Sequence, residues 1–179
     1  ASYFEIQGPQ MLICPVRLGN KPGFLNRFQQ LEFLGLQGIT AGTAAMRNPV
    51  MCNGANLAFT KEIYLKHADN LHPGIASGDD VFLLHNIKKD KGNRVEWLES
   101  ADALVTTELC ETTGMFIRQR ARWISKAGSY NDRFTQLLAI VTCITSLVQL
   151  TLLLASLFNP SMLFVFATFF ILKSIPDFL

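Results

Sequence analysis

Residues 112–158 read TTGMFIRQRARWISKAGSYNDRFTQLLAIVTCITSLVQLTLLLASLF. The second half of this stretch, from Gln136 to Phe158, holds about 23 residues, or roughly 35 Å of helix, against an apolar bilayer core of roughly 30 Å. No charged residue appears between Thr135 and Lys173, whereas residues 1–133 mix charged and apolar side chains. The stretch therefore predicts a domain in water followed by a membrane-spanning helix.

A buried core helix is the alternative, but it would need a larger soluble core than the rest of the chain can build. Gln149 is the strongly polar side chain within the span, and a contact with another helix is expected for it. After the break at Asn159, Pro160 and Ser161, residues 161–179 are apolar but too short to cross. They are expected to be a second, truncated transmembrane segment, with a re-entrant or interfacial segment as the alternative.

Positive residues collect just before the span, at Arg118, Arg120, Arg122, Lys126 and Arg133. Cytosolic flanks of membrane helices collect Lys and Arg, so this end is placed in the cytosol. Within the segment 111–133, an amphipathic helix from about Thr112 to Lys126 is predicted to lie flat on the cytosolic membrane surface. The net charge of +2 and the lack of a basic stripe argue against a nucleic-acid partner.

Short elements are predicted upstream from apolar runs, turn residues and caps. Gly35, Gly38 and Gly42 are expected to weaken the long helix that begins near Phe24, so that it ends near Gly38. Ser77, three residues before Asp80, is expected to cap the helix that carries Val81, Leu84 and Ile87 on one side. The other predicted elements are a strand at 11–16, a strand at 57–59, a helix from Thr60 to about Lys66, and strands in RVEWL (94–98) and ALVTT (103–107).

Three places concentrate polar residues that packing does not require: CNGAN at 52–56, SGDD at 77–80 and QRARW at 119–123. Taken singly, each has an ordinary interpretation, as a turn, a helix cap and a solvated or lipid-anchoring basic face. His85 is expected to be a core histidine, and the four cysteines are expected to be free thiols because no zinc or disulfide spacing appears.

The order of these segments resembles one family. GANLAFTKEIY, then SGDDVFLL, then ADALVTTELCETTGMFIRQRARW is similar to the membrane-integrated branch of glycosyltransferase family 2, which includes cellulose and hyaluronan synthases. The resemblance implies an α/β fold, the later half of a GT-A type domain followed by transmembrane helices. Residues 1–110 would be the acceptor-side half of that domain, 111–133 the interfacial helix, and 135–158 the first span.

The resemblance implies a role for each motif. Asp80 matches the general base, and Asp79 takes the preceding acidic position, where the family often has Glu. Gln119 and Arg122 match donors to the diphosphate of a nucleotide-sugar, and Trp123 offers a flat face for a pyranose ring. Acceptor contacts are expected, on weaker grounds, from Cys52, Asn53, Gly54 and Asn56.

The implied activity is inverting transfer from a nucleotide-sugar, expected to be a UDP-sugar, to a saccharide or glycolipid acceptor. A divalent cation, Mg²⁺ or Mn²⁺, is expected in the full-length enzyme, held by a DxD motif that this sequence lacks. The chain is accordingly expected to begin inside a larger one, an integral protein of a bacterial inner membrane with its catalytic part in the cytosol. The alternatives are a non-catalytic membrane-anchored binding module and transfer of a single sugar to a lipid carrier.

Overall fold

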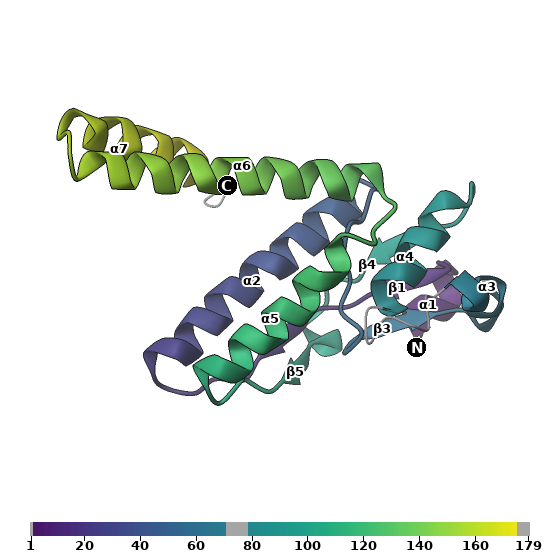
Figure 1. Cartoon of the computed structure of the whole chain (residues 1–179). Helices are drawn as coiled ribbons and strands as arrows, with labels where there is room; N and C mark the ends of the chain where they lie inside the picture. Colours follow the sequence, from purple (N-terminus) through teal and green to yellow (C-terminus); the bar gives the residue numbers. More distant parts are fainter. Residues whose placement is uncertain (1, 71–78, 175–179) are drawn as a thin grey trace. The chain divides into compact units, whose positions relative to one another are not determined.

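A computed structural model describes residues 2–70 and 79–174. The chain divides into two compact units, with the boundary between Asp132 and Arg133. The first unit is mixed α/β and the second is a helical hairpin (Figure 1). The elements in chain order are α1 Ser2–Gln7, β1 Met11–Ile13, β2 Val16–Leu18, α2 Phe24–Ala45, β3 Leu57–Phe59, α3 Lys61–His67, η1 Ala68–Asn70, α4 Asp79–Lys89, β4 Val95–Trp97, η2 Ala101–Ala103, β5 Val105–Thr107, α5 Thr113–Ala127, α6 Arg133–Ser156 and α7 Ser161–Ser174.

Two small sheets form the centre of the first unit. β1 pairs with β3 antiparallel and with β4 parallel, while β2 pairs with β5 parallel. The run predicted as one strand at 11–16 is divided at Pro15, which has no N–H to donate to a ladder. The Pro15 carbonyl instead accepts bonds from the Val105 N–H (3.1 Å) and the Asn56 side-chain amide (2.8 Å). The chain thereby passes from one sheet to the other.

The core forms where α4 packs against β1. Met11 and Ile13 of β1 are fully buried, as are Leu84 and Ile87 of α4. The apolar stripe predicted for this helix is therefore confirmed. Burying each such side chain contributes roughly 1.5–3 kcal/mol, which anchors the start of α4 firmly. The cap predicted for Ser77 lies outside the described residues.

The end predicted for α2 near Gly38 is wrong, because the helix continues to Ala45. Thr40, Thr43 and Ala44 are buried in its last turns. The side chain of Gln37 accepts a hydrogen bond from the Val16 N–H at 3.1 Å. These tertiary contacts outweigh the weak helix propensity of the three glycines, roughly 1 kcal/mol each relative to alanine.

Local signals predicted several further elements of the first unit, but not α1, η1 or η2. Thr60 caps α3 as predicted, with its hydroxyl accepting from the Ile63 N–H at 3.3 Å. β3, β4 and β5 form within the predicted segments. α5 begins after Thr112, whose hydroxyl accepts from the Met115 N–H at 3.2 Å, and it ends at Ala127. The helix predicted from about Thr112 to Lys126 is thus confirmed.

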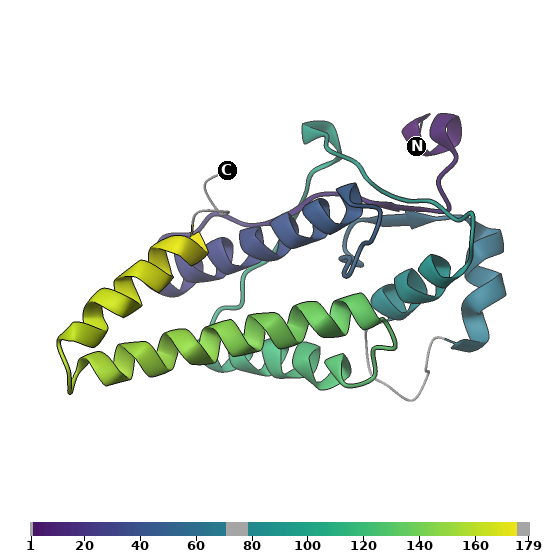
Figure 2. The same ribbon diagram turned by 90° about the horizontal axis from the view of Figure 1, so that it is seen from above.

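The second unit consists of α6 and α7, which fold back on each other (Figures 1 and 2). α6 is long and apolar enough to cross a membrane, and it is the one such helix in the described ranges 2–70 and 79–174. α7 has 14 residues, which is too few to cross. Asn159 stabilises the turn before α7, because its Oδ1 accepts from the Ser161 N–H at 3.0 Å.

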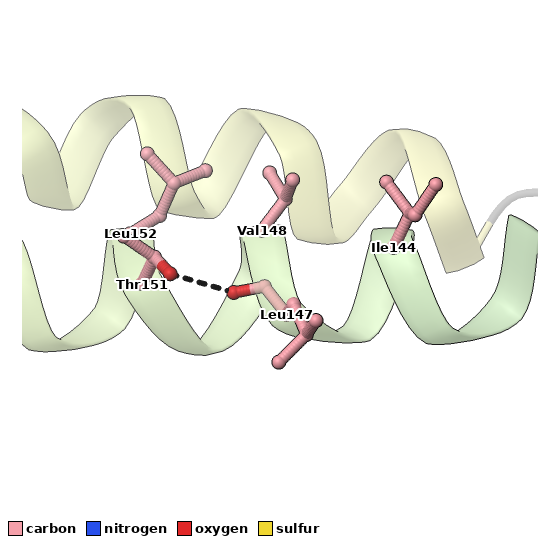
Figure 3. A pocket seen from close by; sticks show the side chains of 5 residues that line it. All are labelled: Ile144, Leu147, Val148, Thr151 and Leu152. Atoms are coloured by element: carbon pink, nitrogen blue, oxygen red, sulfur yellow. Dashed lines mark hydrogen bonds between the residues drawn. The ribbon is translucent and has the colours of Figure 1, made fainter. Parts of the chain in front are cut away.

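The two helices of this unit contact one another through polar and apolar side chains. Lys173 of α7 donates to the Gln149 side-chain carbonyl of α6 at 3.1 Å, so the helix contact predicted for Gln149 is confirmed. A shallow apolar depression lies on α6, where Ile144, Val148 and Leu152 point toward α7 (Figure 3). Its lining has no ionisable group, so it is a packing surface rather than a site for chemistry.

Candidate functional site

Asp80 is fixed in place at the start of α4 by two backbone groups. Its Oδ2 accepts from the Gly54 N–H at 2.8 Å, and its Oδ1 accepts from the Val81 N–H at 2.9 Å. The side chain is half-buried at the edge of the core, whereas Asp79 is exposed. Each carboxylate oxygen has two lone-pair positions, so Asp80 retains the capacity to accept a further proton or hydrogen bond.

The loop at 52–56 approaches Asp80 closely at Gly54. A Cβ atom added at this residue would lie 3.1 Å from Asp80 Oδ2. A side chain there would require the carboxylate to move by a few tenths of an ångström. Asn53 tightens the same turn, since its Oδ1 accepts from the Ala55 N–H at 2.9 Å. Glycine is needed here for close approach rather than for an unusual backbone angle.

Asn56, predicted to contact an acceptor, forms hydrogen bonds to the protein framework. Its side-chain amide donates to the Pro15 carbonyl at 2.8 Å and to the Ala103 carbonyl at 2.6 Å. Its own carbonyl accepts from the Cys14 N–H at 3.1 Å. Both amide hydrogens are thus used to hold the loop against β1 and η2. The role that the structure supports for Asn56 is positioning the loop.

Cys52 and Tyr130 lie near enough to Asp80 to feel its charge. Both pack against the core cluster. Burial, followed by the charge of Asp80, raises the pKa of the Cys52 thiol well above its usual range. Burial, followed by the charges of Asp80 and Cys52, raises the pKa of Tyr130. Both side chains are therefore neutral at pH 7, and Cys52 is a contact residue rather than an activated nucleophile.

Sequence reasoning missed Tyr130. Its ring packs edge-on against Phe82, with centroids 5.7 Å apart, and against His85, at 5.2 Å. His85 itself is buried and its Nε2 lies 3.1 Å from the Val50 carbonyl oxygen, as expected of a core histidine. No local signal distinguishes Tyr130 in the loop after α5, because its neighbours come from α4.

A cavity of about 120 Å³ lies between the same loop and α5. Asn53 and Ala55 line it on the loop side, and Gln119 and Trp123 line it on the α5 side. The loop at 52–56 thus contacts Asp80 through Gly54 and the cavity through its neighbours. Ligand pockets usually measure roughly 300–1,000 Å³, so this cavity suits one polar group of a ligand rather than a whole sugar nucleotide.

Arg120 lines the cavity, whereas Arg122, which the resemblance matches to a hydrogen-bond donor for the diphosphate, does not. Arg122 is exposed. The Arg120 guanidinium lies over Trp123, 4.1 Å from the ring centroid, and it donates to Gln119 Oε1 at 2.6 Å. It also forms an ion pair with Glu32 of α2. These contacts hold Gln119 and Trp123 in fixed orientations.

A sequence signal for Arg120 existed in its spacing. Phe116, Arg120 and Trp123 are separated by four and three residues, so they share one face of α5. The Arg120 guanidinium lies 4.6 Å from the Phe116 ring centroid, and cations favour such positions over aromatic faces. The acidic partner on α2 lies 88 residues away in sequence, so it was not predictable.

Gln29 of α2 clamps the chain just before α5. Its side chain donates to the Cys110 carbonyl and accepts from the Cys110 N–H, each at 3.0 Å. Gln29 is buried and lines the cavity. The Cys110 thiol in turn lies 3.5 Å from Gln119 Oε1 and donates to it. This network connects α2 to the cavity wall.

In the described ranges, no cluster of three or more His, Cys, Asp or Glu side chains could hold a metal ion. No protein-family model, curated protein sequence or solved structure matches this chain. The site combines a carboxylate at the start of α4, a glycine loop beside it, and an amide, a guanidinium and an indole on α5.

Proposed function

We propose that this chain is the acceptor-side part of a membrane-bound inverting glycosyltransferase with a GT-A type domain. The observation that carries the proposal is the loop at 52–56, which contacts Asp80 at Gly54 and lines the cavity with Gln119 and Trp123. A potential base and a set of polar and aromatic contacts are thereby brought to one place. The order of the three motifs, which resembles that of family 2 enzymes, supports the same proposal.

In the proposed reaction Asp80 accepts the proton of an acceptor hydroxyl. The hydroxyl oxygen attacks the anomeric carbon of a UDP-sugar from the side opposite the diphosphate. The bond from that carbon to the diphosphate oxygen breaks, UDP leaves with the electron pair, and the configuration inverts. Gln119 would donate a hydrogen bond to the leaving group, and Trp123 would stack on the acceptor ring.

In this proposal Arg122 and Asn56 have roles that differ from those first expected, and Arg120 is added. Arg120 would orient Gln119 and Trp123, because its guanidinium contacts both. Arg122 is exposed, and it would serve the diphosphate only if donor binding brought that group to the open side of α5. Asn56 would hold the loop. Acceptor contacts would come from Asn53 and from the backbone at Gly54.

The exposure of Arg122 favours a second candidate function, a membrane-anchored binding module in which the basic side of α5 docks anionic lipid. Arg122→Lys separates the two. Lipid docking should tolerate the swap because both side chains carry the charge. A diphosphate held by the planar guanidinium fork should not.

The test of catalysis is Asp80→Asn in the full-length polypeptide that contains this chain. Transfer from radiolabelled UDP-sugars in membrane vesicles should fall about a hundredfold to ten-thousandfold, as for loss of a general base. Donor affinity should be nearly unchanged. Asp79→Asn removes the same charge one residue away, from an exposed position, and it should cost much less.

Folding needs a control, because asparagine has one acceptor oxygen where Asp80 has two in use. The amide group would face one of the two backbone N–H donors, a loss of about 1–3 kcal/mol. Expression level and donor binding of the variant show that the domain is still folded. Near-normal turnover by Asp80→Asn, or greater damage from Asp79→Asn, would remove Asp80 as the base.

A further inference from the structure

The cavity beside the loop at 52–56 has a wall that the proposed reaction does not use. Leu18 at the end of β2 lies opposite Thr107 at the end of β5 in the parallel pairing. Both residues line the cavity, and so does Glu108, which follows β5 directly. Glu108 is exposed, so its carboxylate belongs to the mouth of the cavity. A ligand that enters the cavity therefore passes a negative charge.

Arg120 supplies the positive charge in the lining, but its donors are already used within the protein. Its Nε and Nη2 donate to the Glu32 carboxylate, and its Nη1 donates to Gln119 Oε1 at 2.6 Å. The Phe116 and Trp123 rings lie over the guanidinium, with centroids 4.6 and 4.1 Å from its central carbon. An arginine binds a carboxylate most strongly through two parallel N–H donors. Because each nitrogen of Arg120 already donates to a protein acceptor, it is poorly placed to offer such a fork to a ligand.

The charges in and beside the cavity therefore have an excess of carboxylate. Among the described residues that line it, Glu108 and Arg120 are the ionisable ones, and the charge of Arg120 is compensated by Glu32. Asp80 adds a second carboxylate beside the lining, because its Oδ2 accepts from the N–H of Gly54 in the loop. An ionised carboxylate accepts hydrogen bonds and donates none. This surface therefore favours a ligand that brings hydroxyl donors and repels one that brings a carboxylate.

The rest of the lining suits one face of a sugar ring. Leu18, Phe33 and Trp123 supply apolar surface, and Asn53 supplies a polar group. A pyranose ring has a face of C–H groups and an edge of hydroxyl groups, so it can stack on an indole while its hydroxyls reach a carboxylate. With a volume of about 120 Å³, the cavity admits part of one such ring.

We propose that the cavity binds an uncharged sugar unit of the acceptor, and that Glu108 is the residue that selects against sugars carrying a carboxylate. The Glu108 carboxylate accepts hydrogen bonds from ring hydroxyls, while the ring stacks on Trp123. A uronic acid brings a second carboxylate to the same mouth, where Arg120 is already paired with Glu32. The inference rests on the proposed function for expecting a saccharide, and it adds the substrate class, a neutral hexose unit.

Binding of matched sugars tests this selection. The whole chain in detergent is titrated at low salt with methyl β-glycosides in two pairs, glucose with glucuronic acid and galactose with galacturonic acid. Within each pair the sugars differ only at the exocyclic carbon, which is a hydroxymethyl group in one and a carboxylate in the other. Tryptophan emission reports stacking on Trp123. Trp97, which packs against the core cluster, contributes a constant background, and a Trp123→Phe chain shows that background alone.

The neutral sugar of at least one pair should bind, and its uronate should bind about fivefold more weakly, the factor expected for two like charges about 4 Å apart in water. Glu108→Gln keeps the size of the side chain and removes its charge, so it should abolish the preference. Glu111→Gln is the matched control. It removes the same charge from an exposed residue outside the lining, and the preference should persist.

Equal binding of the two sugars in every pair overturns the proposal, as does a preference that Glu108→Gln retains. Tighter binding of the uronates would assign the mouth of the cavity to an acidic ligand. If no glycoside changes the emission, the cavity does not bind a neutral hexose and the proposal fails.

These outcomes are separate from those for Asp80→Asn, because binding is measured rather than transfer. Selective binding of neutral sugars by a protein without transfer activity would contradict the proposed reaction alone. Transfer that depends on Asp80, without any selection against uronates, would contradict the role of Glu108 alone.

Discussion

α4 and α2 both carry apolar residues at helical spacing, but they place them in opposite environments. Leu84 of α4 is completely buried, as is Ile87. Leu31 and Leu34 of α2 are largely exposed, while polar Gln29 and Thr40 of that helix are buried. A helical pattern in a sequence therefore reveals that an apolar face exists, but it does not reveal which surroundings that face will meet.

The polar side of α2 can be buried because its groups are satisfied. Gln29 forms two bonds to the Cys110 backbone, and Gln37 accepts from the Val16 N–H. The hydroxyls of Thr40 and Thr43 donate to carbonyls one turn earlier in the helix, at 2.8 and 2.7 Å. Buried polar groups without such partners would cost about 1–3 kcal/mol each. α2 is thus an inverted helix, apolar outside and hydrogen-bonded inside.

The largest expected effect contrasts two leucines. Leu84→Ala should destabilise the first unit by about 2–5 kcal/mol, because it leaves a cavity in the core. Leu31→Ala should change stability by no more than about 0.5 kcal/mol, because that side chain makes little contact within the protein. Urea unfolding of the whole chain in detergent, followed by Trp97 fluorescence, measures both. Equal losses would show that α2 packs on part of the protein as α4 does.

A smaller effect distinguishes two neighbouring glutamines of α2. Gln29→Ala should cost about 1–3 kcal/mol, because it leaves the half-buried N–H and carbonyl of Cys110 without their partner. Gln30→Ala removes a single bond to the Gly19 carbonyl and should cost about 0.5–1.5 kcal/mol. The same unfolding experiment applies. If Gln30→Ala were the more damaging, the stability of the first unit would not depend on the two hydrogen bonds between Gln29 and the Cys110 backbone.

The smallest expected effect is a dependence of the free energy of unfolding on pH, which arises from α4 and not from the buried face of α2. Burial lowers the pKa of His85 below its ordinary value of about 6.5. The unfolded chain then binds the proton more readily, so this contribution is present above about pH 6.5 and is lost as pH falls through the folded pKa. One proton changes stability by at most about 1.4 kcal/mol per pH unit.

His85→Gln should remove this component between pH 6.5 and 5. Asp90, whose pKa is lowered chiefly by its hydrogen bond to Lys66, contributes a loss only near and below its ordinary pKa of about 4. The buried face of α2 has no titratable group. If the free energy of unfolding changed with pH by the same slope in the wild-type and His85→Gln chains over this range, the pH dependence would not come from His85.

The candidate site was predictable in its parts and not in its connections. The three polar segments stand out in the sequence, and the structure brings Gly54 to Asp80, and Asn53 to the same cavity as Gln119 and Trp123. Tyr130 was missed because its partners Phe82 and His85 are distant in sequence, whereas for Arg120 only the partner Glu32 is distant. The motif directed attention to Arg122, whereas the side chain that lines the cavity is Arg120.

By itself the sequence determined the features that depend on neighbours within a few residues. The apolar run of α6, the Thr60 cap and the stripe of α4 are of this kind, because length, spacing and a cap three residues away are local properties. Only the tertiary structure decided which side of α2 is buried, how the Gly54 backbone holds Asp80, and that Glu32 pairs with Arg120. These contacts join residues 26 to 88 positions apart, and no periodicity along the chain specifies which distant group will satisfy a buried donor or leave an apolar face uncovered.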